Sequence, residues 1–332
     1  LFSFFLLLSW LLYLWYRESG KYVFMILGAI AYLCSGLSKS MGFPFVAIIF
    51  FMDFYFGEKW SFRQALLKTP YYLSFLALAV LYGFANFLLP QPEQAAAVPP
   101  DTSMDFFVQA ENQISSLPYI ASLPEWLQIV VTTSARVVLW IVHCFIPYNT
   151  SIIYSHNEVY GYIGQGIFLY PVMLLLLFWY AWKVRKKYSY LLAGLVFYLI
   201  IMVPVLAIPE SGQAIFMSDR YTYIPSIGLF FILVSFVIQK LSNKNAQYAV
   251  LGSLAALFSI ESTRIVGNWK NSVALFSRAL GIYPESGLAH LNLGLYYRQI
   301  KDYDKALAVY SEGVQYSKGY LQLYANRSRI LL

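Results

Sequence analysis

The stretch SYLLAGLVFYLIIMVPVLAI, residues 189–208, decides the fold class because it carries no charged side chain over its whole length. An α-helix rises about 1.5 Å per residue, so roughly 20 apolar residues cross the hydrocarbon core of a bilayer. The stretch therefore predicts a transmembrane helix. It comes just after the basic cluster KVRKK, residues 183–187, and such clusters are typical of the cytoplasmic ends of spans.

The composition extends this interpretation to the rest of the chain. The 332 residues are 59% hydrophobic and only 12% charged, whereas a soluble domain has about 25% charged residues. The net charge of +7 fits basic segments at a membrane surface better than it fits nucleic-acid binding. We therefore predict an all-α, polytopic bundle of about eight or nine apolar helices. The other apolar segments are 1–16, 22–37, 43–56, 70–89, 126–146, 166–182, 221–239 and 246–260.

The charge distribution assigns sides of the membrane to the connections. Residues 57–68 (GEKWSFRQALLK) and 183–187 are basic and should be cytoplasmic, whereas residues 90–125 hold five acids and no Lys or Arg and should form an exterior loop. Alternation of the spans then puts both ends of segment 126–146 on the same side. This favours a re-entrant or non-spanning helix, and the alternative is an ordinary span with one basic loop that breaks the charge rule.

Residues 263–332 are amphipathic and fit the tetratricopeptide pattern, in which small residues let paired helices approach and aromatic residues fill the groove between them. The pattern positions are occupied by Leu293, Gly294, Tyr297, Ala306 and Tyr310. A shift of about 34 residues aligns a preceding unit and a following one, which contain Phe276, Ala279, Pro284 and Leu321 to Leu332. We thus predict a membrane domain over 1–262 and a repeat solenoid over 263–332, with a generic helical hairpin as the alternative to the solenoid.

Two polar clusters border the predicted spans on the exterior face. Lys39 lies in GLSKSMGFP, and a lysine there either snorkels to the surface or binds an anion such as a lipid phosphate. In SDRYTYIPS, the planar guanidinium of Arg220 suits phosphate. Asp219 can orient that arginine or bind a sugar hydroxyl. Tyr221 and Tyr223 suit either sugar binding or the interfacial aromatic belt.

Three further residues are candidates for binding substrate. His156 and Glu158, in YSHNEVYGYIGQG, can bind hydroxyls or do acid–base chemistry, although a polar loop at the membrane edge is the plainer interpretation. Arg136 lies in an otherwise apolar stretch, where an arginine is a functional candidate by default. It can bind phosphate, or it can pair with an acid such as Asp105, Glu111 or Glu125.

Other kinds of site are not indicated by the sequence. The three histidines show no metal-ligand spacing, so no divalent metal or other cofactor is expected. Cys34 and Cys144 both lie in apolar segments, where inert thiols are more typical than a disulfide. The sequence has no P-loop, dinucleotide fingerprint, zincin motif or nucleophile elbow.

The order of these features resembles the transmembrane and tetratricopeptide-repeat O-mannosyltransferases and their bacterial relatives, in the polytopic C superfamily of glycosyltransferases. The resemblance covers nearly the whole chain. The residues that carry it are LSK (37–39), FIPYNTSIIY (145–154), VPVLAIPESGQAIFMSDRYTYIPSIGLFF (203–231) and the repeats.

The resemblance implies transfer of a sugar, often mannose, from a polyprenyl phosphate to a protein hydroxyl on the periplasmic or lumenal face. Lys39 and Arg220, with Arg136 as a further candidate, would hold the donor phosphate, and the repeats would present the acceptor polypeptide. The protein would lie in a bacterial inner membrane, or in the endoplasmic reticulum of a eukaryote. The family's catalytic acid lies in the first exterior loop, which we expect to precede Leu1, and LSKS replaces the commoner LSKE. The chain starts inside an apolar run and stops inside a helical pattern, so we expect further residues at both ends.

Two other classes stay open. An O-antigen ligase or polymerase also uses polyprenyl-linked sugars, and a paired-acid loop after the first span would argue against it. A non-enzymatic, membrane-anchored scaffold would recruit partners through the repeats, and it predicts that Lys39, Arg136 and Arg220 do not converge.

Overall fold

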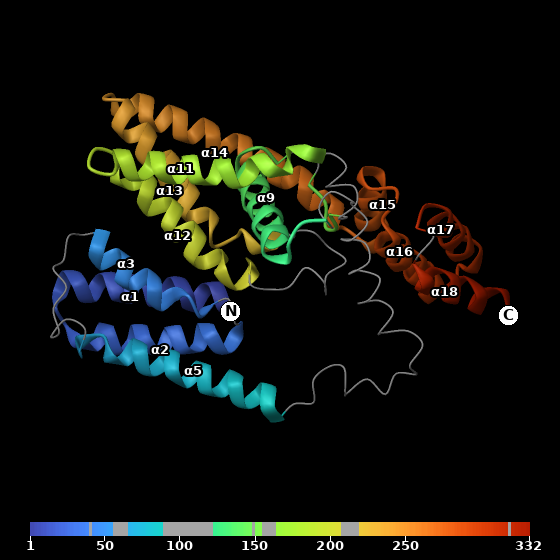
Figure 1. Cartoon of the computed structure of the whole chain (residues 1–332), viewed down its shortest axis with the longest axis horizontal. Helices are drawn as coiled ribbons and strands as arrows, with labels where there is room; N and C mark the ends of the chain where they lie inside the picture. Colours follow the sequence, from blue (N-terminus) through green and yellow to red (C-terminus); the bar gives the residue numbers. More distant parts are fainter. Residues whose placement is uncertain are drawn as a thin grey trace. The chain divides into compact units, whose positions relative to one another are not determined.

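The structure is a computed structural model that describes residues 1–39, 42–55, 66–88, 122–147, 150–154, 164–206, 219–317 and 320–332. Within these ranges the chain forms thirteen α-helices and no strand (Figure 1), which confirms the predicted all-α class. Every predicted apolar segment contains a helix. His156, Glu158 and nearly all of the predicted exterior loop at 90–125 lie outside the described residues.

The chain forms two compact units. Unit 1 contains Leu1–Ala95, Tyr180–Ile208 and Tyr221–Ile232, and unit 2 contains the rest. The main helices of unit 1 are α1 (Phe2–Ser19), α2 (Tyr22–Ser38), α3 (Phe45–Tyr55), α5 (Thr69–Leu88), α12 (Ser189–Leu206) and the start of α13 (Ser226–Lys240). Those of unit 2 are α9 (Glu125–Phe145), most of α11 (Leu169–Val184), α14 (Lys244–Val266), α15 (Ser272–Ile282), α16 (Gly287–Gln299), α17 (Tyr303–Tyr316) and α18 (Leu321–Leu331).

In unit 1, small residues and tyrosines allow close helix packing. Helix α2 lies beside both α1 and α5 (Figure 1). A Cβ atom at Gly28 of α2 would collide with the hydroxyl of Tyr71 on α5, and Ser9 of α1 donates a hydrogen bond of 2.8 Å to the carbonyl of Gly28. Gly194 and Gly228 likewise bring the backbones of α12 and α13 into contact. Small residues of this kind are typical of helix interfaces in membranes.

Four described helices are long and apolar enough to cross a membrane, which indicates an integral membrane protein. They span Glu125–Phe145, Gly166–Val184, Ser189–Leu206 and Lys244–Trp269. The second and fourth bury almost none of their apolar side chains within the protein, as expected of surfaces that face lipid. Helix α9 (Glu125–Phe145) has spanning length, so a single crossing and a re-entrant path both remain predictions.

The polar segment DRYTYIP, residues 219–225, does not belong to the helix that follows it. The sequence predicts an apolar helix from residue 221, but α13 begins at Ser226, and Asp219–Tyr221 form a short 3₁₀ helix, η4. Pro225 explains the delay, because a residue before proline is disfavoured in the α conformation. Asp219 and Arg220 therefore lie on a separate turn and not on the first turn of α13.

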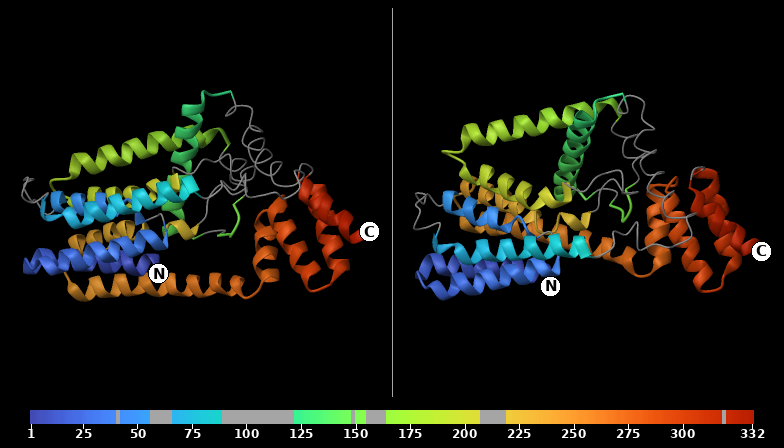
Figure 2. Two further views of the ribbon diagram at one scale, coloured as in Figure 1. Left: turned by 90° about the horizontal axis from the view of Figure 1, so that it is seen from below. Right: turned by 60° about the horizontal axis from the view of Figure 1, so that its bottom comes forward.

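The last four helices pack in chain order, each against the next (Figure 2). Ala306 and Tyr310 of α17 are fully buried, and a Cβ at Gly294 of α16 would collide with the ring of Tyr310. This close packing fits the helix pairs expected over residues 263–332, while the tetratricopeptide solenoid itself stays a prediction. Side-chain caps begin three of the helices, at Asn271, Ser286 and Asp302.

Candidate functional site

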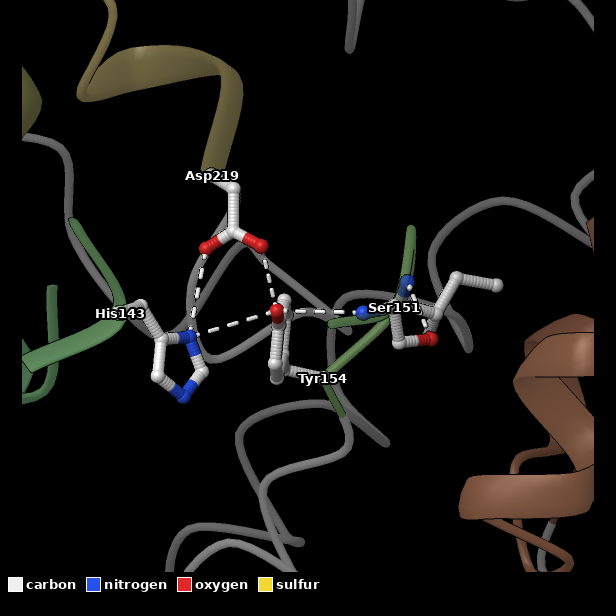
Figure 3. A network of polar contacts seen from close by, with 5 residues as sticks. His143, Ser151, Tyr154 and Asp219 are labelled. Atoms are coloured by element: carbon white, nitrogen blue, oxygen red, sulfur yellow. Dashed lines mark hydrogen bonds and ion pairs between the residues drawn. The ribbon is translucent and has the colours of Figure 1, made fainter. Parts of the chain in front are cut away.

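A network of polar contacts in unit 2 surrounds the carboxylate of Asp219 (Figure 3). The Tyr154 hydroxyl donates to Oδ2 of Asp219, and Nδ1 of His143 lies 3.6 Å from Oδ1. The same imidazole nitrogen is 3.4 Å from the Tyr154 hydroxyl, which also accepts a hydrogen bond of 3.1 Å from the backbone N–H of Ser151. Each carboxylate oxygen thus has its own neighbour, and this fixes the orientation of the group.

The hydroxyl of Tyr154 keeps its proton over a wide pH range. The side chain is 1% exposed, and burial is the main factor that raises its pKa, followed by the negative charge of Asp219 and the hydrogen bond to it. Loss of the proton would place two negative charges side by side away from water. Tyr154 is therefore a fixed hydrogen-bond donor to Asp219.

Three separate segments hold this network in place. His143 lies in the last turn of α9, Asp219 opens η4, and Tyr154 ends the described segment 150–154. That segment packs on the helices that follow the last span: Ile153 forms a small core with Ala279 and Ala289, and the rings of Tyr154 and Tyr283 meet edge to face with centroids 5.9 Å apart.

Beside the network lies a cavity of about 120 Å3 in unit 2. At roughly 30 Å3 per water molecule, it has room for about four waters or one compact anionic group. Both members of the Asp219–Arg220 pair line it, so the conspicuous charge pair of the sequence borders a space that a ligand can enter. The other described lining residues are Thr150, Ser151, Ile152, Ile265, Asn268, Trp269, Leu275 and Arg278.

Lys39 contacts the ring of Tyr221, the residue that follows Arg220 in the sequence. Its ammonium group lies 5.1 Å from the ring centroid of Tyr221 in unit 1, a distance typical of a cation–π contact. Tyr223 is 66% exposed, which fits an interfacial position or an open binding surface. Lys39 and Tyr221, which the sequence places on one face of the membrane, are thus neighbours.

Arg136 occupies a different environment. It is 4% exposed, and its Nη2 lies 3.5 Å from Oγ1 of Thr133, one turn earlier in α9. Arg136 is not among the described residues that line the cavity. Within the described part of the chain, no three His, Cys, Asp or Glu side chains form a group that could hold a metal ion.

Sequence analysis missed several of the residues that organise these sites. His143 and Tyr154 were not singled out, although a histidine in the last turn of an apolar segment is a usable signal. A buried ion pair in unit 1 was missed as well: Lys68 and the Tyr13 hydroxyl both donate to the carboxylate of Asp53. An acid inside the apolar run 43–56 was the signal for that pair, because a charge there needs a partner.

No protein-family model, curated protein or solved structure matches this chain. The described helices define a helical integral membrane protein, with a cavity lined by a carboxylate and an arginine.

Proposed function

We propose that the protein is a membrane glycosyltransferase that moves a sugar, mannose by the family resemblance, from a polyprenyl-phosphate donor to a hydroxyl of an acceptor polypeptide. The observation that carries this proposal is the cavity lined by Arg220 and Asp219. A guanidinium suits the donor phosphate, and a carboxylate accepts hydrogen bonds from sugar or acceptor hydroxyls.

The chemistry needs stabilisation of charge on the leaving group. In a displacement at the anomeric carbon, the bond to the lipid phosphate breaks and negative charge grows on the phosphate oxygen. Arg220 stabilises that charge if the phosphate binds in the cavity. The displacement also needs a carboxylate that takes the proton of the acceptor hydroxyl. Lys39 is the second phosphate ligand that the resemblance implies.

The helices after the last span are proposed to present the acceptor. The close approach of Gly294 to the ring of Tyr310 supports the proposal that these helices are tetratricopeptide repeats. Stacks of such repeats form concave surfaces that bind peptides. The acceptor hydroxyls would thereby be delivered on the same side of the membrane as the cavity, which we propose to be periplasmic or lumenal.

The test is sugar transfer by the full-length protein, with polyprenyl-phosphate-mannose as donor and a Ser/Thr-rich polypeptide as acceptor. We expect Arg220→Ala to lower kcat/KM by about 100-fold, and Lys39→Ala to lower it as well. Arg185→Ala is the matched control, since Arg185 stacks on Trp182 in the basic connection between α11 and α12, and it should retain parental activity.

Two results would contradict the proposal. If Arg220→Ala and Lys39→Ala transfer mannose as the parent does, these residues are membrane anchors and not donor ligands. If the parent is inert with every polyprenyl-phosphate sugar tried, the ligase and scaffold classes take precedence.

A further inference from the structure

We propose that the first helix after the last span contributes directly to the substrate site, with Arg278 of α15 binding the same phosphate group as Arg220. This inference rests on the proposed function and deepens it. By sequence, residues 263–332 are an acceptor-binding module alone, whereas the structure places one of their arginines on the wall of the cavity.

The charge of the cavity favours an anion. Its described lining contains two arginines, Arg220 and Arg278, and one acid, Asp219, so the formal charge is 2 − 1 = +1. Both arginine side chains are exposed, so water weakens their mutual repulsion, and an anion bound between them would lower it further. The carboxylate of Asp219 is also a neighbour of Tyr154 and His143 (Figure 3), so its charge is shared with those groups.

The position of the cavity along α14 indicates which anion it holds. The membrane-length helix Lys244–Trp269 ends at the cavity, which Ile265, Asn268 and Trp269 line. Trp269 is 60% exposed, and tryptophan is enriched where a span leaves the hydrocarbon core. With the helix Lys244–Trp269 as a span, this end of it, and the cavity beside it, would lie at the depth of lipid headgroups, where the phosphate of a polyprenyl lipid would be.

The wall that carries Arg278 is firmly attached to the rest of the site. The residue after it, Ala279, is fully buried in the small core with Ile153 and Ala289. Ile153 directly precedes Tyr154, whose hydroxyl donates to Asp219. Packing thus connects α15 to the network around Asp219 and fixes the backbone that carries Arg278 beside the cavity.

Binding by the full-length protein in detergent tests this role. The probe is a short-chain polyprenyl monophosphate, titrated by isothermal calorimetry. We expect Arg278→Gln to weaken binding at least 10-fold, and Arg278→Lys to weaken it less, because lysine keeps the charge but loses the planar fork. Arg329→Gln makes the same chemical change on an exposed arginine of α18 and should bind as the parent does.

A second titration separates the two sources of phosphate. Inorganic phosphate, added in competition, should displace the lipid probe only at concentrations at least 100-fold higher than the probe itself. If inorganic phosphate competes as well as the lipid probe, the lipid assignment is wrong. The variants Arg278→Gln and Arg278→Lys are first confirmed as folded by size-exclusion chromatography. If both then bind the probe with parental affinity, the role of Arg278 is wrong.

This experiment can fail independently of the proposed function. If the parent transfers sugar while Arg278→Gln binds the probe normally, the role of Arg278 is wrong and the glycosyltransferase proposal stands. If binding depends on Arg278 but no sugar is transferred to any acceptor, the phosphate site stands and the glycosyltransferase proposal is wrong.

Discussion

Two carboxylates, one in each unit, have the same kinds of partner but differ in their access to solvent. Asp53 accepts from the Tyr13 hydroxyl and from Lys68, and its side chain is 10% exposed. Asp219 accepts from the Tyr154 hydroxyl, lies 3.6 Å from an imidazole nitrogen, and is 32% exposed. Only Asp219, of these two, lines the described cavity.

The comparison shows how one chemical arrangement serves two purposes. Both oxygens of Asp53 are engaged inside the packed interior, where the charges stabilise each other and a ligand has no room. At Asp219 the same arrangement holds a carboxylate at the edge of an open space. Exposure to solvent, and not the kind of partner, therefore distinguishes Asp53, which stabilises the fold, from Asp219, which is the candidate functional carboxylate.

The largest effect is expected from breaking the buried pair of unit 1. Lys68→Ala removes the ammonium group that pairs with the buried carboxylate of Asp53, which should destabilise the protein by about 3–5 kcal/mol. The loss should be visible as a lower midpoint of thermal unfolding in detergent, followed by tryptophan fluorescence.

The matched control removes both charges together. Asp53→Asn combined with Lys68→Met should recover most of the lost stability, since no buried charge is left without a partner. If the double variant is as unstable as Lys68→Ala, packing around Lys68 and not its charge accounts for the loss.

Asp219→Asn should have the opposite profile, with a small effect on stability and a large one on activity. Asparagine fills the same volume and still accepts from Tyr154, so we expect a destabilisation of about 1–2 kcal/mol. Sugar transfer should fall by about 100-fold, because the carboxylate proposed to accept hydrogen bonds from a sugar or acceptor hydroxyl is lost. A stability loss as large as that of Lys68→Ala, with activity kept, would contradict the distinction between the two carboxylates.

Most of the helical architecture could be predicted from sequence, for a simple physical reason. Apolar runs of spanning length leave the backbone no alternative to a helix in lipid, and every such run contains one. The start of α13 was predicted less accurately than the helix itself. The apolar pattern continues to residue 221, and only the effect of Pro225 on the residue before it moves the helix start to Ser226.

The candidate site was predictable only in part. Asp219 and Arg220 stand out because charges at the edge of an apolar run are rare. Their partners do not, because His143 and Tyr154 are distant in sequence and meet Asp219 only through tertiary packing. Arg278 was hidden for a different reason: it belongs to an amphipathic helix, in which an exposed arginine is ordinary.

A smaller effect should distinguish the two tyrosines. Tyr13→Phe and Tyr154→Phe each remove a hydrogen bond to a carboxylate, so each should cost about 1–3 kcal/mol of stability. Only Tyr154→Phe should also lower sugar transfer, by about 10-fold, because it frees the carboxylate at the cavity. A parallel loss of activity in Tyr13→Phe would mean that both carboxylates serve catalysis.

The stability difference between the parent and Tyr154→Phe should also depend on pH. Burial raises the pKa of Tyr154 in the folded state, whereas an unfolded tyrosine titrates near pH 10. The folded protein keeps a proton that the unfolded chain loses, so this contribution to stability falls as the pH rises above about 10. The stability gap between parent and Tyr154→Phe should therefore narrow between pH 9 and 11 in thermal unfolding, and a gap that widens would contradict the assignment of the hydroxyl as a donor.

The smallest effect is expected at a third carboxylate, Asp302, which has a lysine partner at the surface. Nζ of Lys305 donates to it at 2.7 Å, and this hydrogen bond lowers the pKa of Asp302, but the lysine is 63% exposed and water screens the pair. Lys305→Gln should therefore leave the unfolding midpoint at pH 7 almost unchanged. Any small difference from the parent should vanish in high salt. It should also vanish as the pH falls from the unfolded value of about 4 through the lower folded pKa of Asp302, where the carboxyl takes up its proton. If Lys305→Gln destabilises the protein as much as Lys68→Ala does, burial does not explain the strength of the Asp53–Lys68 pair. The contrast between Asp53 and Asp219 would then need another cause.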